Sequence, residues 1–310
     1  SWYRRQRQMC IRDRCTPNDT HAEIAVAALA AGKHVWCEKP MSTTLADSTA
    51  MANAAASSAG KTIIGYNYTK NPAVTHARRL IDDGVIGRVS GFFCRYDVDN
   101  EADGNRPWSW RMSRAQSGTG SNGDVLSHVI SVAHFLTNSS ISRVVGDYTI
   151  VHKERADSQA AGQTKIVDND DMVAALIHFE NGVKGHIGAS RVTWGRKCGL
   201  RWELHGTEGT IMYDQERLNE LKLFTRQDNP ATDGFRTILT GPLHEPYAAF
   251  LPNGGHSLGY MDVKICELHD LLSAIEANSP VWPSFSDGLK IERVMDAVDR
   301  SAQTNKWVDV

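Results

Sequence analysis

This sequence lacks the long apolar run, the cysteine pairs and the strong charge imbalance that mark three large classes of protein. No stretch approaches the roughly 18 consecutive apolar residues of a membrane-spanning helix, so no membrane partner is expected. The six cysteines are scattered without a C-x-x-C pair, which favours free thiols in the cytoplasm over a disulfide framework. The formal net charge of −2 argues against a nucleic-acid partner, which binds to a basic surface.

Two further signatures are missing. The twelve histidines show neither an H-x-x-x-H nor an H-E-x-x-H spacing, so no metal site is expected. A dinucleotide-binding domain normally begins with a glycine-rich G-x-G-x-x-G loop after its first strand, yet the first glycine of this chain is Gly32. We therefore expect any such domain here to lack its first half.

The first fourteen residues do not resemble the rest of the chain. They hold five arginines, no apolar core of a signal peptide and no regular strand pattern. We expect residues 1–14 to be a non-native leader, such as translated adapter or vector sequence joined to an incomplete reading frame, and exclude them from the fold.

The chain that follows alternates helix and strand. Alanine-rich helices are predicted for residues 21–31 and 44–59, each followed by a glycine, and short apolar strands for residues 33–38 and 61–65. Helix and strand in alternation predict a parallel α/β layer, and two strands alone are too few to form one.

Beyond Arg88 the pattern is rich in strands. Strands are predicted for residues 89–97, 142–151, 171–179, 183–189, 201–205 and 209–213, and helices for 71–83, 123–136, 262–277 and 287–304. The fold class is therefore α/β with an α+β C-terminal part. Residues 15–66 would be the second half of a Rossmann domain, and residues 67–310 a substrate-binding and oligomerisation domain with a large open, mainly antiparallel sheet.

The tripeptide Glu38-Lys39-Pro40 follows a predicted parallel strand. A lysine at the carboxyl end of such a strand faces the crevice where α/β sheets bind ligands, and its ammonium can stabilise a developing alkoxide. For an isolated tripeptide, a surface lysine beside a turn proline is the more common explanation, so the motif alone is weak.

Asp124 and His128 lie four residues apart on a predicted helix and hence on one face. The imidazole could act as general base while the carboxylate orients it or holds a neighbouring hydroxyl. A solvated pair on a helix surface is the plainer interpretation of this spacing.

Two polar loops contain aromatic and basic residues. Trp108-Ser109-Trp110-Arg111 lies in a loop over residues 97–122, where the arginine could pair with a phosphate or a polar substrate and the tryptophans could stack on a ring or pack in the core. The loop from Gly254 to Tyr260 could direct His256 and Tyr260 into a pocket or cap the next helix.

Taken together, the motifs of this chain resemble those of the Gfo/Idh/MocA oxidoreductases, the family of glucose–fructose oxidoreductase and inositol dehydrogenases. The resemblance runs from Cys15 to Val310. The shared segments are T-P-N-D-T-H from Thr16, A-G-K-H-V-W-C-E-K-P up to Pro40, N-P-A at Asn71, G-V-I-G-R-V at Gly84, G-D-V-L-S-H up to His128, and D-G-L-K-I-E-R-V-M-D-A from Asp287.

The resemblance implies an NAD- or NADP-dependent enzyme that moves a hydride between the nicotinamide and a hydroxyl carbon of a sugar or polyol. It implies Lys39, Asp124 and His128 as catalytic residues, with the histidine as acid and base. Cofactor contacts are expected from Thr16, Pro17, Asn18, His21, Glu38, Lys39, Asn67, Trp110, Arg111 and Tyr260. Substrate contacts are expected from Lys39, Tyr96, Arg111, Asp124, His128 and His256.

The same resemblance implies a homodimer or homotetramer formed through the C-terminal sheet, and the W-S-W-R loop is similar to relatives that handle pyranose or anhydro-sugar rings. The family often has an acid where this chain has Ser131, so a second substrate-binding carboxylate is not expected. Two alternatives stay open: an NAD-dependent glycosidase of the same fold, and a non-catalytic sensing or dimerisation protein.

Overall fold

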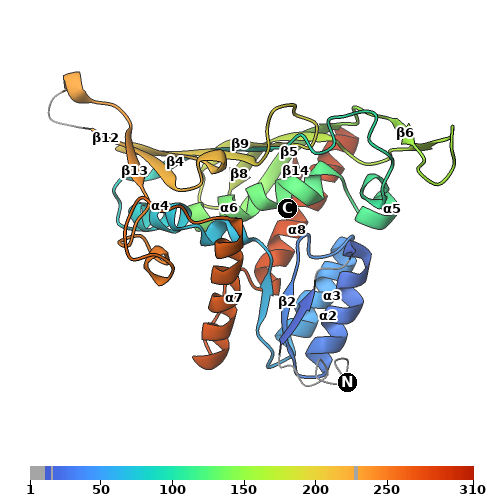
Figure 1. The fold of residues 1–310 in the computed structure, drawn as a ribbon, viewed down its shortest axis with the longest axis horizontal. Coiled ribbons are helices and arrows are strands. Elements are labelled where there is room, and N and C mark those ends of the chain that lie inside the picture. The colour runs from blue at the N-terminus through green and yellow to red at the C-terminus, as the bar shows by residue number, and fades with distance from the viewer. Residues whose placement is uncertain (1–10, 15–16, 227–229) are drawn as a thin grey trace.

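The computed structural model describes residues 11–14, 17–226 and 230–310, with the main chain alone for residues 11–14. Two sheets organise these residues: a three-stranded parallel sheet and a nine-stranded sheet that lies across it (Figure 1). A separate two-stranded hairpin is made by β6 (Glu154–Ala156) and β7 (Thr164–Ile166).

The small sheet has the order β1-β2-β3, with strands β1 (Ile11–Arg14), β2 (His34–Cys37) and β3 (Thr62–Ile64) all parallel. The sequence predicted two strands here and excluded residues 1–14, so β1 corrects that expectation. The letters I-R-D-R carry no apolar strand signal, and β1 is held to β2 by parallel main-chain pairing.

Helices α2 (His21–Ala30) and α3 (Leu45–Ala56) connect these strands and pack on each other. Helix α3 begins after Thr44, whose side chain accepts a hydrogen bond from the Asp47 amide at 3.1 Å, as an N-cap residue does. Ala25, Leu29 and Met51 are buried, so these alanine-rich helices supply the core of the small layer.

The large sheet has the order β13-β12-β11-β10-β4-β9-β8-β5-β14. Its central pair β4–β9 is parallel, and the other neighbouring strands are antiparallel. The strand bounds are β4 Val89–Asp97, β5 Ile141–Thr149, β8 Met172–Phe179, β9 Lys184–Ser190, β10 Gly199–Gly206, β11 Gly209–Asp214, β12 Glu220–Thr225, β13 Arg236–Leu239 and β14 Val308–Asp309. The predicted open and mainly antiparallel sheet is confirmed.

One face of this sheet is covered by α4 (Pro72–Asp82), α6 (Ser127–Thr137) and α8 (Phe285–Thr304), as Figure 1 shows. Strand β8 illustrates the two faces, since Val173 and Ile177 are buried while Met172 and Leu176 are exposed. In the part of the chain that the structure describes, no helix covers the opposite face.

Helix α8 also joins the two sheets, because it packs against α3 and β3 as well as β5. Gly288 on α8 packs closely against the end of β3 and the segment after β2. A Cβ at this position would lie 3.0 Å from the Met41 sulfur and 3.0 Å from Ile64 Cγ1. A further helix, α7 (Tyr260–Glu276), stands beside the small sheet.

The sequence missed β6, β7, β12, β13 and β14, and it took residues 123–136 for one regular helix. The short edge strands pair through main-chain groups and need little side-chain signal. Over the described ranges, no helix is both long enough and apolar enough to cross a membrane.

The burial pattern of β8 predicts that truncating Ile177 and truncating the neighbouring Leu176 lower the free energy of unfolding by unequal amounts. Ile177→Ala, at a fully buried site, should lower the free energy of unfolding by about 2–5 kcal/mol, because it leaves a cavity in the core. Leu176→Ala, at a side chain 54% exposed on the open face, should cost less than about 1 kcal/mol. Urea unfolding followed by circular dichroism measures both, and equal losses would contradict the assignment of faces.

Candidate active site

A cleft of about 500 Å³ opens where β2 ends and the small layer meets the large sheet. Nine residues predicted from the sequence line it: Pro17, Asn18, His21, Glu38, Lys39, Trp110, Arg111, Asp124 and Tyr260. Sequence reasoning missed five others: Pro40, Ser117, Thr119, Gly120 and Arg191. Segments far apart in the chain therefore meet at one place, as the carboxyl ends of parallel strands predict.

Lys39 and Asp124 form an ion pair at the centre of the cleft. The Lys39 ammonium donates to Asp124 Oδ1 and to the Asp124 carbonyl oxygen, each at 2.7 Å. The Asp124 side chain is 42% exposed, and the Lys39 side chain 19%. Lys39 above all lowers the pKa of Asp124 against the effect of burial, with help from Arg111 and Arg191. Asp124 is therefore an anion at neutral pH.

Asp124 lies on a π-helical turn, η4 (Asn122–Leu126), that leads into α6. The sequence predicted a regular helix with Asp124 and His128 on one face, where the carboxylate orients the imidazole or holds a neighbouring hydroxyl. The wider i→i+5 turn changes that geometry, and the described residues contain no hydrogen bond between these two side chains. Asp124 contacts Lys39 instead.

His128 is 4% exposed and lies behind the cleft rather than on its wall. Three tyrosine rings surround its imidazole, with ring centroids 5.6 Å away for Tyr66, 4.4 Å for Tyr68 and 5.9 Å for Tyr96. Burial, and then the nearby Lys39 and Lys264, hold the pKa of His128 well below 6.5. The imidazole is neutral at pH 7, and its buried Nδ1 has no partner within the described chain.

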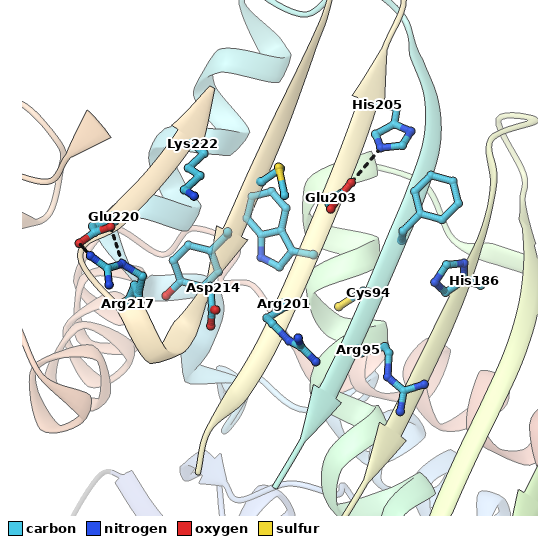
Figure 2. Close-up of a pocket in the computed structure, with 14 residues that line it drawn as sticks. Cys94, Arg95, His186, Arg201, Glu203, His205, Asp214, Arg217, Glu220 and Lys222 are labelled. Carbon is cyan, nitrogen blue, oxygen red and sulfur yellow. Dashed lines mark hydrogen bonds and ion pairs between the residues drawn. The ribbon is translucent and has the colours of Figure 1, made fainter. Parts of the chain in front are cut away.

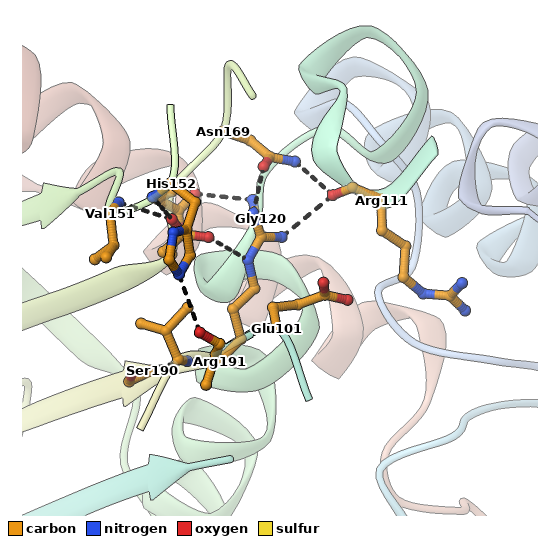
Figure 3. Close-up of polar contacts among 12 residues, drawn as sticks. Glu101, Arg111, Gly120, Val151, His152, Asn169, Ser190 and Arg191 are labelled. Atoms are coloured by element: carbon orange, nitrogen blue, oxygen red, sulfur yellow. Dashed lines mark hydrogen bonds and ion pairs between the residues drawn. The ribbon is translucent and has the colours of Figure 1, made fainter. Parts of the chain in front are cut away.

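Arg191, which the sequence did not single out, is a buried cation beside the cleft (Figure 3). It donates from Nε to Asp171 Oδ1 at 2.8 Å, from one terminal nitrogen to Asn169 Oδ1 at 2.7 Å, and from the other to the Arg111 carbonyl at 3.2 Å. No local pattern around Arg191 signals this role, because its partners come from other segments. The network holds the main chain at Arg111.

The guanidinium of Arg111 points away from this network, as Figure 3 shows. It lies 4.4 Å from the ring centroid of Trp110, a cation–π contact. Among the described residues it has no carboxylate within ion-pair distance. Arg111 thus brings an unneutralised cation, and Trp110 an aromatic ring, to the cleft.

Residues 118–123 read G-T-G-S-N-G, which matches the letters of the dinucleotide glycine pattern in a segment that the sequence predicted to be a plain loop. The match follows the short helix α5 (Arg114–Ser117) and precedes η4, not a strand and a helix of an α/β unit. Its glycines allow close packing, since a Cβ at Gly120 would lie 1.9 Å from the Asp170 carbonyl oxygen.

Asp170 fixes the start of the π-helical turn. Its buried carboxylate accepts hydrogen bonds from the Gly120 amide at 2.8 Å and the Asn122 amide at 2.7 Å. Burial raises the pKa of Asp170, although the two amides oppose that shift. Since the turn carries Asp124, Asp170 positions the carboxylate that Lys39 binds.

Four of the described residues that the sequence predicted for the site do not line the cleft, and His128, which lies behind it, is one of them. Thr16 lies outside the described residues. Asn67 is buried without reaching the cleft, and Tyr96 is buried with its hydroxyl 2.9 Å from that of Tyr68. His256 is exposed on the loop before α7, away from the cleft.

Residues 255–259 of that loop read G-H-S-L-G, the letters of a nucleophile elbow. They follow no strand, and the exposed Ser257 meets no histidine in the described chain. The loop therefore does not have the strand–turn–helix structure that such an elbow needs.

The cleft suits the nicotinamide end of NAD. Trp110 offers an aromatic face, Arg111 an unneutralised cation for a phosphate, and Asn18 and Glu38 polar groups for ribose hydroxyls. Within the described residues no group of three or more His, Cys, Asp or Glu side chains could hold a metal ion.

Comparisons with known proteins agree with this geometry. Residues 14–66 match the sequence model of the oxidoreductase family with an NAD-binding Rossmann fold, and residues 74–212 match that of the GFO/IDH/MocA C-terminal domain. The chain is 38% identical to levoglucosan dehydrogenase of Pseudarthrobacter phenanthrenivorans over 309 aligned residues, covering 96% of this chain and 79% of that one.

Solved structures show the same relationship. A levoglucosan dehydrogenase in complex with NADH and levoglucosan superposes with a TM-score of 0.93 at 39% identity, covering 97% of this chain and 80% of that one. An NAD-binding oxidoreductase from Klebsiella pneumoniae gives a TM-score of 0.95 at 38% identity, covering 100% of this chain and 83% of that one.

Asp170→Ala should lower the free energy of unfolding by about 2–4 kcal/mol, because two buried amides lose a charged acceptor. Asp168→Ala is the matched control. This exposed carboxylate, two residues earlier, accepts one bond from the Arg114 amide, and its loss should cost less than about 1 kcal/mol. Chemical denaturation compares the two, and a cost for Asp170→Ala no greater than that of the control would contradict the positioning role.

Proposed function

Because this chain belongs to the Gfo/Idh/MocA family of NAD-binding oxidoreductases, we propose that it interconverts a hydroxyl and a carbonyl at one carbon of a sugar or polyol. The observation that supports this most directly is the Lys39–Asp124 pair in a cleft fit for a nicotinamide, with a neutral imidazole behind it. NAD, when bound, accepts the hydride from that carbon or returns it.

Lys39 orients the reacting oxygen. An ammonium has three N–H donors, and two of them bind Asp124, so one is left for the substrate hydroxyl. As the hydroxyl loses its proton, the positive charge stabilises the growing negative charge on oxygen. Asp124 keeps the ammonium in place and accepts a hydrogen bond from a second hydroxyl of the ring.

His128 takes the hydroxyl proton during oxidation and returns it during reduction. A neutral imidazole has one unprotonated nitrogen ready to accept a proton, and the low pKa of His128 keeps it in that form. The tyrosine cage around it restricts the rotation of the ring. Glu38, Trp110 and Arg111 would hold the cofactor, and Arg111 also contacts the substrate.

The substrate class follows from the cleft and from the relatives. The walls combine hydroxyl-binding polar groups with Trp110 and Tyr260, whose rings suit the apolar face of a sugar. Relatives have been solved with levoglucosan and with L-sorbose bound. We propose a pyranose or anhydro-sugar as the substrate and the cytoplasm as the compartment.

We further propose that the chain forms a homodimer or homotetramer through the open face of the large sheet. A hollow of about 620 Å³ on this face is lined by residues from several neighbouring strands (Figure 2). The face carries charges of both signs, including the pair Arg217–Glu220 at 2.7 Å, and a contact between Glu203 and His205 at 3.2 Å, beside the exposed Leu176. Mixed charges and exposed apolar groups on one face suit a self-complementary interface.

Lys39→Ala or His128→Ala should reduce turnover of NAD with a sugar panel at least ~100-fold, because each removes a group that acts on the reacting proton or oxygen. The assay uses the protein expressed from the longest open reading frame that contains this chain. His256→Ala is the control and should stay within about twofold of the unsubstituted protein, since His256 lies outside the cleft. A loss below about tenfold for Lys39→Ala or for His128→Ala would contradict the catalytic role of that residue.

Leu176→Arg should convert the assembly to monomers, because it puts a charge where the proposed interface would bury an apolar side chain. Leu243→Arg, at a side chain 88% exposed and off the sheet, is the matched control and should leave the assembly intact. Sedimentation velocity measures both. A monomeric unsubstituted protein would overturn the proposed interface, as would an unaffected Leu176 variant.

A further inference from the structure

Lys264 on α7 forms an ion pair with Glu38, the residue just before Lys39. Its ammonium donates to Glu38 Oε1 at 2.6 Å and to Glu267 Oε2 at 3.2 Å. The contact with Glu38 joins residues 226 positions apart in the sequence. It connects the wall of the cleft to a helix outside the small α/β layer.

The surroundings of Lys264 restrict its movement. The Lys264 side chain is 12% exposed and the Glu267 side chain 0%. The Trp36 indole donates to Glu267 Oε2 at 3.0 Å, and the Lys264 ammonium lies 5.7 Å from the centroid of the Trp36 ring. Two carboxylates and one aromatic ring therefore hold this ammonium from three sides.

The Glu38–Lys264 ion pair packs tightly against the main chain at Gly65. A Cβ at Gly65 would lie 2.7 Å from Glu38 Oε2 and 3.1 Å from the Lys264 ammonium. The Glu38 carboxylate thus lies over the end of β3, with one oxygen bound to Lys264. Glu38 still lines the cleft, with its side chain 25% exposed.

The pKa shifts of Lys264 and its carboxylate partners favour a charged Lys264 side chain. Burial lowers the pKa of Lys264, but Glu267 and Glu38 outweigh it and the net shift is upward, so Lys264 stays charged. Burial raises the pKa of Glu267 to about 7, with Lys264 opposing the shift. Lys264 also helps to lower the pKa of His128, after burial and Lys39.

We propose that Lys264 is a positioning residue of the active site, which fixes the Glu38 carboxylate at the wall of the cleft that would hold the cofactor. The inference rests on the proposed function, because only that function puts a cofactor beside Glu38. The contacts of Lys264 with Glu38 and Glu267 are observed in the structure and do not depend on it. Without the ammonium, Glu38 loses the partner that sets its orientation.

Two measurements test this on variants of Lys264. The first is the Kd for NADH, followed by nucleotide fluorescence in the protein from the longest open reading frame. The second is the titration of His128, followed by NMR of its ring carbons without cofactor. The rings of Tyr66, Tyr68 and Tyr96 face His128 and carry no charge over the range from pH 4 to 8. Lys39 and Lys264 are the cations that lower the pKa of His128.

Lys264→Met should weaken NADH binding about tenfold, because a charged contact that orients Glu38 is lost. It should also move the titration of His128 to higher pH, because one of two cations that disfavour its protonated form is gone. Lys264→Arg keeps the charge and should leave both readouts near those of the unsubstituted protein. Lys264→Gln, neutral but able to hydrogen-bond, should shift His128 upward and serves as the test if the methionine variant does not fold.

Glu267→Gln is the matched control on the same helix, since it keeps the Lys264–Glu38 pair. At pH 8 it should leave the Kd within about threefold. The proposal is overturned by an unchanged Kd in the neutral variants, by a Lys264→Arg variant that loses as much affinity as they do, or by an equal loss in Glu267→Gln, which would assign the effect to the packing of α7. A protein that binds NADH but turns over no sugar would instead overturn the proposed function and leave this inference standing.

Discussion

The ion pair between Lys39 and Asp124 is the contact on which the cleft depends, because it joins the end of a strand in one layer to the turn above a helix in the other. It does not act alone. Four consecutive residues each have a partner on a different element. The four contacts are Glu38 with Lys264 on α7, Lys39 with Asp124 on η4, the Pro40 carbonyl with His21 on α2, and the Met41 amide with Glu292 on α8.

Buried carboxylates without a neighbouring cation are costly, so their presence here needs a local reason. Glu292 is one: burial raises its pKa to about 8, and its Oε1 accepts the Met41 amide at 2.8 Å. Glu267 is also buried; the Lys264 ammonium lies 3.2 Å from its Oε2, and its Oε1 has no partner among the described residues. Both lie against the segment that carries Lys39, where rigidity serves the chemistry better than an apolar core would. Polar groups buried at this place specify one arrangement of the two layers.

The sequence predicted most of the regular elements, because apolar periodicity and glycine stops are local signals. It also predicted nine of the residues that line the cleft, through motifs such as E-K-P. It could not predict the π-helical turn, since the residues around Asp124 are equally compatible with a regular α-helix. Nor could it find Arg191 or Lys264, whose roles arise from partners that are distant in the chain. The roles of the site residues stay predictions.

Helix α8 contributes the Met41 contact from 251 positions further along the chain. A ribosome releases the strands and helices of the small layer long before it has made Glu292. During synthesis those elements can form hydrogen bonds with each other, but the segment after β2 has no carboxylate to receive its amide. The cleft is thus completed late in translation, when the last long helix has been made and has docked.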